Sequence, residues 1–384
     1  MKRFVVFIIA LTVVFSALSP AALAASATPS GAVPSVGAPS AVLMEKLTGD
    51  VIYEKAAHQR CAPASVTKIM TLLLIAEDVD SGRITLDDTV TASARAASFG
   101  GSCVFLAQGE KMTVSEMIKC IAVVSANDCA VAMAEHLSGS EEAFVARMNE
   151  RAEALSLSDT HFTNCTGLFD DDLHYTSAYD VALMSRELLK HDFIKDYTTI
   201  WMDSIRNGEF GLSSTNRLVY YYSGCTGLKT GYTSEAKYCI SATAERDGVE
   251  YIAVVMHADT AEARNADAAA MLDFAFANYT LCSLRGDVAL DNVSVELGRR
   301  ESVSAVFGGQ EYALVKRTGG EAEYALDMLH TVPAPVRKGD RLGTLTVSIG
   351  GTVLASVPVL AGEDVERLGY WGMLSLFGGR MLGL

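Results

Sequence analysis

Residues 60–82, RCAPASVTKIMTLLLIAEDVDSG, are apolar on nearly every side and yet carry Ser65 and Lys68 near their start. The apolar run that follows Lys68 predicts a buried helix. A lysine that leaves water has to be paired, neutralised or used, because burying an unpaired charge is costly. The spacing of Ser65 and Lys68, one helical turn apart, therefore indicates a chemical role that the rest of the chain must explain.

The segments around this helix predict one mixed domain. Residues 40–57 have the pattern of a strand hairpin that turns at Thr48-Gly49-Asp50, and the helix follows this hairpin directly. Three more strand-like runs come later in the chain, followed by a helical run over 261–279. The order strands, helices, strands, helix predicts an antiparallel sheet built from both ends of the domain, with a helical subdomain inserted. The three later runs are 225–232, 237–246 and 250–258.

The inserted segment, from about residue 113 to 191, is helical in pattern. The first predicted helix has uninterrupted apolar periodicity and contains Ser125. In the last one, Ser177 and Asp180 stand at the spacing of a capping box, so we expect Asp180 to be structural. The predicted helices are 114–137, 141–155 and 176–191.

The ends of the chain suggest further divisions. Lys2 and Arg3, an apolar run and the small-residue site Ala22-Leu23-Ala24 are typical of a secretory signal peptide, so we expect an exported protein. A retained membrane anchor is the less favoured alternative, because the run is short for a bilayer span. After the last helix, short alternating segments with Gly turns predict a small β domain. The expected divisions are a signal peptide (1–24), a tether (25–40), the mixed domain (41–280), the β domain (281–365) and a tail (366–384).

Composition argues against several classes of function. The net charge is −15, or −17 once residues 1–24 are removed, so we expect no nucleic-acid partner. The eight cysteines have wide, irregular spacing that defines no disulfide pattern. The chain has no CxxC or HExxH motif and its seven histidines are scattered, so we expect no metal and no cofactor.

Three short motifs in a fixed order carry the chemistry. They are Ser65-x-x-Lys68, Ser125-Ala126-Asn127 and Lys229-Thr230-Gly231. Each motif alone is weak, because the chain also contains imitations of all three. The context makes the set strong: Ser65 opens a buried helix, Ser125 lies in a helical segment, and Lys229 lies on a strand beside another strand. The imitations are Ser234-x-x-Lys237, Ser214-Thr215-Asn216 and Arg317-Thr318-Gly319.

With these motifs the chain resembles the low-molecular-mass penicillin-binding proteins, specifically the serine-type D-alanyl-D-alanine carboxypeptidases. The resemblance runs from about Ala41 to the C-terminus. It implies a β-lactamase/transpeptidase-like domain of the α/β (α+β) type, an acyl-enzyme reaction on peptidoglycan stem peptides, and β-lactam antibiotics as covalent inhibitors. The further matching segments are PASVTKIMT, GEKMTVSEMI, SANDCAVAMAEHL, HYTSAYDVALMSREL and GLKTGYTSEAKYC.

Physical chemistry gives roles to the first motif. The unpaired N–H groups at a helix start favour negative charge, so Ser65 is helped to lose its proton and its own N–H can face an oxyanion. Burial and the positive helix end lower the pKa of Lys68, so that a neutral amine can take the Ser65 proton. The alternative, a snorkelling lysine at a helix edge, is disfavoured by the other motifs. If Lys68 is the base, Ser125 is expected to relay a proton toward the leaving group and Asn127 to bind a substrate amide.

The third motif and one arginine are expected to bind substrate. Lys229 and Thr230 would hold the terminal carboxylate, and Gly231 would let an extended peptide approach the strand edge. By resemblance, the backbone N–H of Tyr232 completes the oxyanion hole and Arg264 contacts the carboxylate. The alternative for Arg264 is a solvated helix charge.

Four residues depart from the family pattern or lie close to the motifs. Thr226 stands where the family often has Asp, and Lys237 stands where it usually has Gly; we expect both to tune the site without abolishing it. Cys61 and Cys129 lie near the motifs in sequence. They could provide a thiol or disulfide at the border of the cleft, but the favoured interpretation is that they are buried packing residues.

Three other functions compete with the carboxypeptidase reading. A class A β-lactamase would need Glu-x-x-x-Asn between Asn127 and Lys229, and none occurs there. A non-catalytic wall-binding scaffold would not need the intact motifs. Endopeptidase action on cross-links uses the same chemistry and stays open.

The tail, LGYWGMLSLFGGRMLGL, predicts membrane attachment. Trp371, Leu374, Phe377 and Met381 recur at roughly helical spacing, and the aromatic residues suit a headgroup interface. We therefore expect modest attachment to the outer face of the cytoplasmic membrane. Packing of the tail against the β domain is the alternative.

Overall fold

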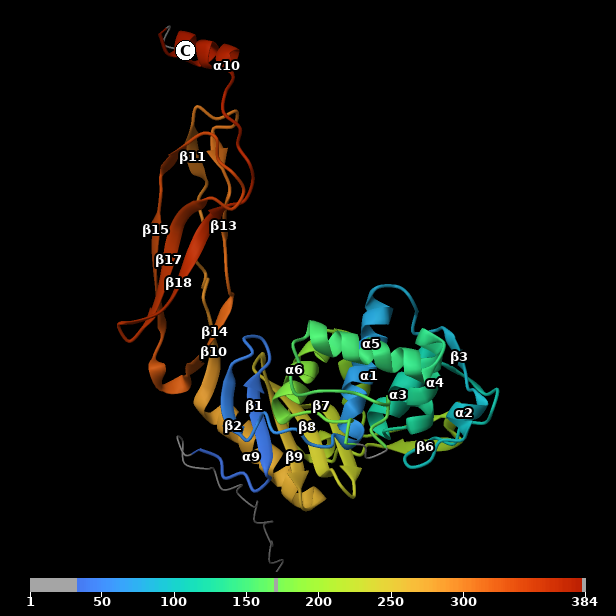
Figure 1. Cartoon of the computed structure of the whole chain (residues 1–384). Coiled ribbons are helices and arrows are strands. Elements are labelled where there is room, and N and C mark those ends of the chain that lie inside the picture. The colour runs from blue at the N-terminus through green and yellow to red at the C-terminus, as the bar shows by residue number, and fades with distance from the viewer. Residues whose placement is uncertain (1–32, 169–171, 382–384) are drawn as a thin grey trace, which may run out of the picture.

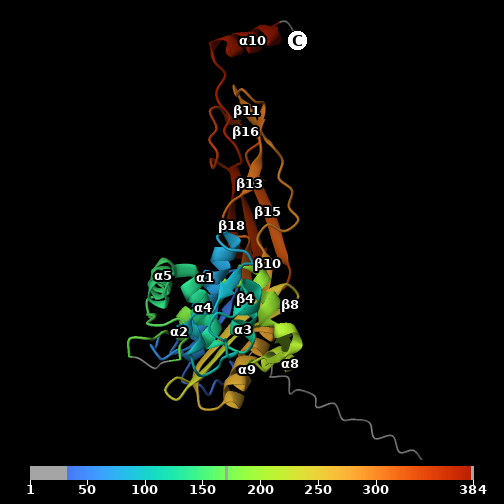
Figure 2. The same cartoon turned by 90° about the vertical axis from the view of Figure 1, so that its right-hand side faces the viewer.

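The computed structural model describes residues 33–168 and 172–381. They form a mixed body of helices and strands, an elongated β region that rises from it, and a helix, α10, beyond the far end of that region (Figures 1 and 2). The predicted signal peptide and the first part of the predicted tether lie outside the described residues.

A five-stranded sheet in the order β2-β1-β9-β8-β7 forms the centre of the body. All its neighbouring strands are antiparallel, and Val42 of β1 lies opposite Val254 of β9. The sheet thus joins segments from both ends of the domain, which confirms the predicted arrangement. Its strands are β1 (Ser40–Glu45), β2 (Val51–Lys55), β7 (Cys225–Thr233), β8 (Lys237–Arg246) and β9 (Val249–Ala258).

The two faces of this sheet are covered by different helices (Figure 1). Side chains alternate along a strand, so Val42 and Met44 of β1 face the inserted helices, whereas Ala41 and Leu43 face α9. Ser65 lies where the chain passes from the sheet into the helices. The main helices are the 3₁₀ turn η1 (Ala64–Thr67), α1 (Lys68–Asp80), α3 (Val114–Val123), α4 (Asn127–Ser138), α5 (Glu141–Ala154), α6 (Ala178–Leu188) and α9 (Ala261–Asn278).

Short elements complete the body. Four short strands form two small antiparallel pairs, β3 with β4 and β5 with β6, at the edge of the helical subdomain. The short elements are β3 (Thr89–Thr91), α2 (Ala94–Ala97), β4 (Lys111–Thr113), η2 (Asp192–Ile194), α7 (Lys195–Thr198), β5 (Met202–Ile205), η3 (Arg206–Gly208), β6 (Phe210–Ser213) and α8 (Leu218–Tyr221).

The start of α6 shows the predicted capping only in part. The Ser177 hydroxyl accepts a hydrogen bond from the Asp180 N–H at 3.2 Å. The Asp180 carboxylate does not return a bond to Ser177; it accepts from the N–H of Asp159 and the hydroxyl of Thr160. Asp180 is structural, as expected, because it ties α6 to the segment that follows α5.

The predicted helix over 114–137 is wrong, because the structure breaks it into α3 and α4 and places Ser125 in the turn between them. Ser125 has a φ of +63°, and the N–H of Ala126 bonds to the Cys120 carbonyl at 3.1 Å. This is a left-handed helix end, a position that glycine usually occupies. Here the residue is serine and the apolar periodicity continues past it, so the sequence pattern does not mark the break.

The all-β region after α9 confirms the expected second fold class. Its largest sheet has the order β13-β18-β17-β15, and the Arg317 guanidinium donates to the Phe276 carbonyl of α9 at 2.8 Å. The strands are β10 (Tyr279–Ser283), β11 (Val293–Glu296), β12 (Ser302–Val303), β13 (Ala305–Phe307), β14 (Tyr312–Lys316), β15 (Ala322–Met328), β16 (Thr331–Pro333), β17 (Arg341–Ile349) and β18 (Thr352–Ala361), with the turn η4 (Arg317–Gly319) after β14 and helix α10 (Tyr370–Met381) at the end.

Candidate active site

Ser65 lies in the 3₁₀ turn η1, directly before α1, and is half-buried. The preceding residue, Ala64, has a φ of +47° and is 1 % exposed, so the chain enters the turn in a left-handed conformation that alanine rarely adopts. Lys68 is the first residue of α1 and is fully buried. The sequence pattern thus placed Lys68 correctly at the start of the buried helix, whereas Ser65 lies within a 3₁₀ turn before that helix and does not open the helix itself.

The contacts of Lys68 orient its amine toward Ser65. Lys68 Nζ lies 2.6 Å from Asn127 Oδ1, 2.7 Å from the Thr166 carbonyl and 3.0 Å from Ser65 Oγ. The first two oxygens can only accept hydrogen bonds. A neutral amine has two N–H groups to give them, so its lone pair is left to face the Ser65 hydroxyl, the one contact that can donate.

Burial makes this neutral form available. The pKa of Lys68 is lowered from 10.5 to about 7, chiefly because the amine is removed from solvent, while Cys165, Cys103 and Asp128 oppose the shift. A base whose pKa lies near 7 is suited to general base catalysis at neutral pH. The sequence predicted a lowered pKa for Lys68 and named burial as one of two causes.

The turn between α3 and α4 supplies Ser125, and the first residue of α4 is Asn127. The Asn127 amide nitrogen donates to the Gly100 carbonyl at 2.8 Å, which fixes its oxygen toward Lys68. Ser125 is 4 % exposed, and its hydroxyl has no hydrogen-bond partner among the described residues. A buried hydroxyl without a partner is unfavourable. It is therefore available to a group that enters the site, although the structure does not join it to Lys68.

Strand β7 brings the third motif against the Ser65 turn. A Cβ at Gly231 would lie 2.9 Å from the Ser65 backbone nitrogen, so the strand and the turn approach closely at this glycine. Lys229 is 1 % exposed, and its amine donates to the Thr230 carbonyl at 2.8 Å. Burial first, and then the charges of Lys68 and Arg264, hold the pKa of Lys229 well below its usual value. The side chains of Lys68, Lys229 and Arg264 therefore lie in one neighbourhood.

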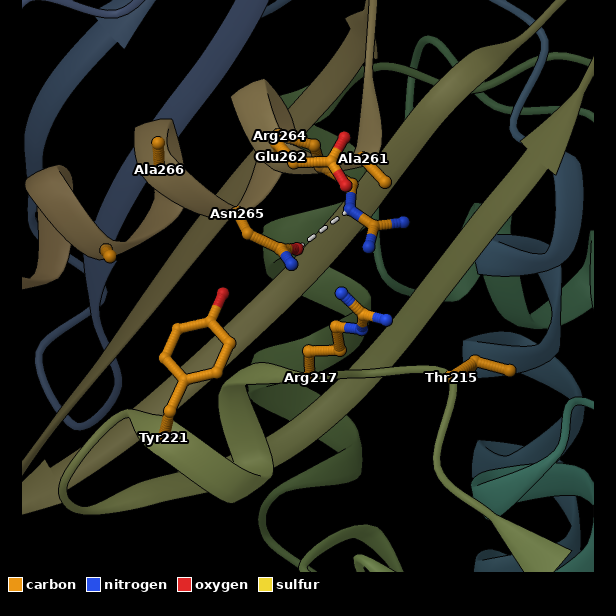
Figure 3. Close-up of a pocket in the computed structure, with 9 residues that line it drawn as sticks. Thr215, Arg217, Tyr221, Ala261, Glu262, Arg264, Asn265 and Ala266 are labelled. Atoms are coloured by element: carbon orange, nitrogen blue, oxygen red, sulfur yellow. Dashed lines mark hydrogen bonds between the residues drawn. The ribbon is translucent and has the colours of Figure 1, made fainter.

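A pocket of about 550 Å³ lies between the start of α9 and a segment that comprises α8 and the loop before it (Figure 3). Arg217 and Arg264 both line it, and Arg264 is only 5 % exposed. The Arg264 Nε donates to Asn265 Oδ1 at 3.0 Å. Arg264 is therefore not a solvated helix charge, and its burial also lowers its pKa.

Sequence reasoning missed several residues of this site. Thr215 lies in the segment that imitates the second motif, yet its hydroxyl accepts from Thr230 at 2.7 Å and it lines the same pocket as Arg217. Thr166 contributes only a backbone carbonyl, which no sequence motif reveals. Tyr232, in contrast, was expected to act through its N–H, and its side chain is 59 % exposed and stacks on Tyr238.

The departures from the family pattern have local explanations. The Thr226 hydroxyl donates to the buried carboxylate of Glu250 at 2.7 Å. Lys237 has a φ of +51°, the conformation that favours the usual glycine, and pairs with Asp259 at 2.6 Å. All eight cysteines are free thiols. Cys129 is fully buried in the core, which agrees with the packing interpretation.

Comparisons with known proteins agree with the motifs. The family model of D-alanyl-D-alanine carboxypeptidase, peptidase S11, matches residues 26–260, and the model of the penicillin-binding protein 5 C-terminal domain matches 282–367. The D-alanyl-D-alanine carboxypeptidase DacF of Bacillus subtilis is 45% identical over 339 residues, 87% of each chain. The DacC enzyme of Escherichia coli is 30% identical, over 88% of this chain and 86% of the relative.

Solved structures give the same result. Penicillin-binding protein 5 from Haemophilus influenzae superposes with a TM-score of 0.76 at 26% identity, covering 88% of this chain and 99% of that one. Penicillin-binding protein D2 from Listeria monocytogenes, in the ampicillin-bound form, matches with a TM-score of 0.57 at 30% identity, covering 63% of this chain and 98% of that one.

The fold and the motifs together define the class of protein as a serine hydrolase, in which the buried Lys68 amine lies 3.0 Å from Ser65 Oγ. The chain belongs to the peptidase S11 family of D-alanyl-D-alanine carboxypeptidases, and it carries the C-terminal β domain of penicillin-binding protein 5. This confirms the family, the fold class and the enzyme class that the motifs predicted.

Proposed function

We propose that the chain removes the terminal D-alanine from peptidoglycan stem peptides through an acyl-enzyme on Ser65. The observation that carries this proposal is the geometry of Lys68, whose two obligate acceptors direct its lone pair to the Ser65 hydroxyl. Lys68 takes the hydroxyl proton as Ser65 Oγ attacks the penultimate D-Ala carbonyl. The Ser65 N–H, and by resemblance that of Tyr232, stabilise the resulting oxyanion.

The breakdown of this intermediate requires a proton on the leaving amine. The protonated Lys68 gives it up, and Ser125 relays it, since its buried hydroxyl has no other partner among the described residues. The C–N bond breaks, D-alanine departs and an ester to Ser65 remains. Water then hydrolyses the ester, with Lys68 again as the base, and restores the free hydroxyl.

The leaving residue is recognised by its carboxylate. Lys229 is buried with the Thr230 carbonyl as its hydrogen-bond acceptor, and burial together with the charges of Lys68 and Arg264 disfavours its protonated form. A concentration of buried positive charge at this point is unfavourable until an anion enters. The free carboxylate of a terminal D-alanine fits this requirement, and a peptide without one does not.

The test is release of D-alanine from a peptide that ends in D-Ala-D-Ala. The wild type should release it and Ser65→Ala should not. The matched control is Ser234→Ala, the same change in the imitation motif, which should retain wild-type release. Equal release by wild type and Ser65→Ala would remove the proposed mechanism.

We also propose that penicillin acylates Ser65 and leaves slowly. The chain lacks the Glu-x-x-x-Asn pair of class A β-lactamases between Asn127 and Lys229, so no such pair activates a deacylating water. A stable fluorescent-penicillin adduct is expected on the wild type. Rapid hydrolysis of benzylpenicillin by the purified protein would contradict this, and a failure to label would restore the scaffold hypothesis.

Export and attachment to the outer face of the cytoplasmic membrane form the last part of the proposal. In α10, Tyr370, Trp371 and Leu374 are 73%, 78% and 53% exposed, which supports a surface-lying helix more than packing against the β domain. Among the helices that the structure describes, none is long and apolar enough to span a bilayer. Fractionation of the exported protein with and without the residues after Arg367 tests the attachment; identical distribution of the two forms would refute it.

A further inference from the structure

Residues 163–167, a segment that follows α5, pack directly against the 3₁₀ turn that contains Ser65. A Cβ at Gly167 would lie 1.8 Å from the Ala64 carbonyl oxygen and 2.6 Å from Thr67 Oγ1, so the two backbones are in close contact here. The neighbouring Thr166 places its carbonyl 2.7 Å from Lys68 Nζ. The position of this segment therefore sets one of the two acceptors that orient the Lys68 amine.

His174 connects this segment to the turn, and its surroundings fix its tautomer. The Thr163 N–H donates to His174 Nδ1 at 3.0 Å, and the Thr163 hydroxyl and the Asn164 amide nitrogen lie 3.3 and 3.5 Å from the same atom. A ring nitrogen that accepts from a backbone N–H carries no proton. The proton of the neutral ring is therefore on Nε2.

The protonated Nε2 of His174 points at the catalytic turn. It lies 2.8 Å from Thr67 Oγ1, so it donates to this hydroxyl. The Thr67 hydroxyl in turn donates to the Ala64 carbonyl, also at 2.8 Å. His174 and Thr67 are 2% and 0% exposed, so water does not compete for these bonds. Ala64 is the residue in left-handed conformation that immediately precedes Ser65.

We propose that His174 is a positioning residue for acylation. Through Nδ1 it holds the backbone at Thr163, and through Nε2 and Thr67 it holds the Ala64 carbonyl, so the Ser65 turn and the Thr166 carbonyl are kept in register around Lys68. His174 touches neither substrate nor the reacting atoms. The inference rests on the proposed Ser65 acyl-enzyme function.

Two substitutions separate the two bonds of His174. In His174→Asn, the short side chain can still accept from the Thr163 N–H but cannot reach Thr67. In His174→Gln, the amide nitrogen occupies the place of Nε2 and can still donate to Thr67, while the bond from Thr163 is lost. Each variant therefore loses one bond of the pair, and only the Asn variant loses contact with the catalytic turn.

The experiment measures acylation of the purified full chain by fluorescent penicillin, with the rate at saturation separated from apparent affinity. We expect His174→Asn to lose about 10- to 100-fold in the saturated rate with little change in affinity, since a displacement of about 1 Å in a catalytic group can cost this much. We expect His174→Gln to recover most of that loss. D-alanine release should follow the same order.

A merely structural role would give a different result. The melting temperature of both variants is measured alongside the acylation rate. The inference is overturned if the loss of rate simply follows the loss of melting temperature, or if the rate falls equally in the two variants. If His174→Asn does not fold, Thr67→Val and Thr67→Ser provide the same test. The saturated acylation rate should fall in Thr67→Val and stay near that of the wild type in Thr67→Ser, and equal rates in the two variants overturn the inference. A wild type that neither labels nor releases D-alanine refutes the proposed function instead.

Discussion

The acylation of Ser65 should depend on pH through Lys68. Its pKa of about 7 means that half of the amine is neutral near that pH, whereas with the ordinary value of 10.5 only about 1 in 3,000 would be. The saturated rate of acylation by benzylpenicillin should therefore rise through pH 7 to a plateau. At pH 5 it should be about one hundredth of the plateau, because each pH unit below the pKa removes a factor of about ten.

The assay is stopped-flow or quenched labelling at saturating penicillin, which separates acylation from binding. The variant Asn127→Asp sharpens it, because it replaces the oxygen 2.6 Å from Lys68 Nζ with a charged one. A carboxylate at that distance should raise the pKa of Lys68 by about 1–3 units and move the acid limb to higher pH by the same amount. A wild-type rate that stays constant from pH 5 to 8, or a limb that Asn127→Asp leaves in place, would refute the assignment of Lys68 as the base.

Three further outcomes follow from particular contacts. Gly231→Ala should lower kcat/KM for D-alanine release by about 10- to 100-fold, because its Cβ would meet the Ser65 nitrogen at 2.9 Å; an unchanged value would contradict the close approach. Arg264→Gln should raise KM for a peptide with a free terminal carboxylate by about tenfold or more, and should leave unchanged the KM of its C-terminal amide. Lys237→Gly should be more stable to thermal unfolding than Lys237→Ala by about 1 kcal/mol. Both variants lose the ion pair with Asp259, but only glycine adopts a φ of +51° without strain. Equal melting temperatures would show that the backbone there is unstrained.

The sheet and the reacting pair could be predicted because their signals are local. The hairpin turn at Gly49, the alternating strands and the one-turn spacing of Ser65 and Lys68 all appear within short windows of sequence. The break at Ser125 could not, because its left-handed conformation is stabilised by a bond from Ala126 to Cys120 and no glycine marks it. The functional turn was thus hidden inside an apparently continuous helix.

The rest of the site depends on contacts between distant segments. Thr215 lies within an imitation of the second motif and Arg217 directly follows it, and only the folding of this loop against β7 shows that both residues line the pocket. Thr166 acts through a carbonyl, a group that every residue has. His174 is one of seven scattered histidines, and its role requires knowing which atoms face each of its two nitrogens.

The burial that makes Lys68 a base also opposes folding. Unfolding returns the pKa of Lys68 from about 7 to 10.5, a difference on the order of 5 kcal/mol between the two protonation states. Below pH 7 the amine is protonated in both states, so the folded state is destabilised by this full free-energy difference. Between pH 7 and 10.5 only the unfolded state holds the proton, so this group's contribution to stability rises with pH. Lys229 has a pKa shifted in the same direction for the same cause. These buried amines therefore oppose folding wherever they are protonated, and in the proposed mechanism a substrate carboxylate offsets that cost by supplying a countercharge.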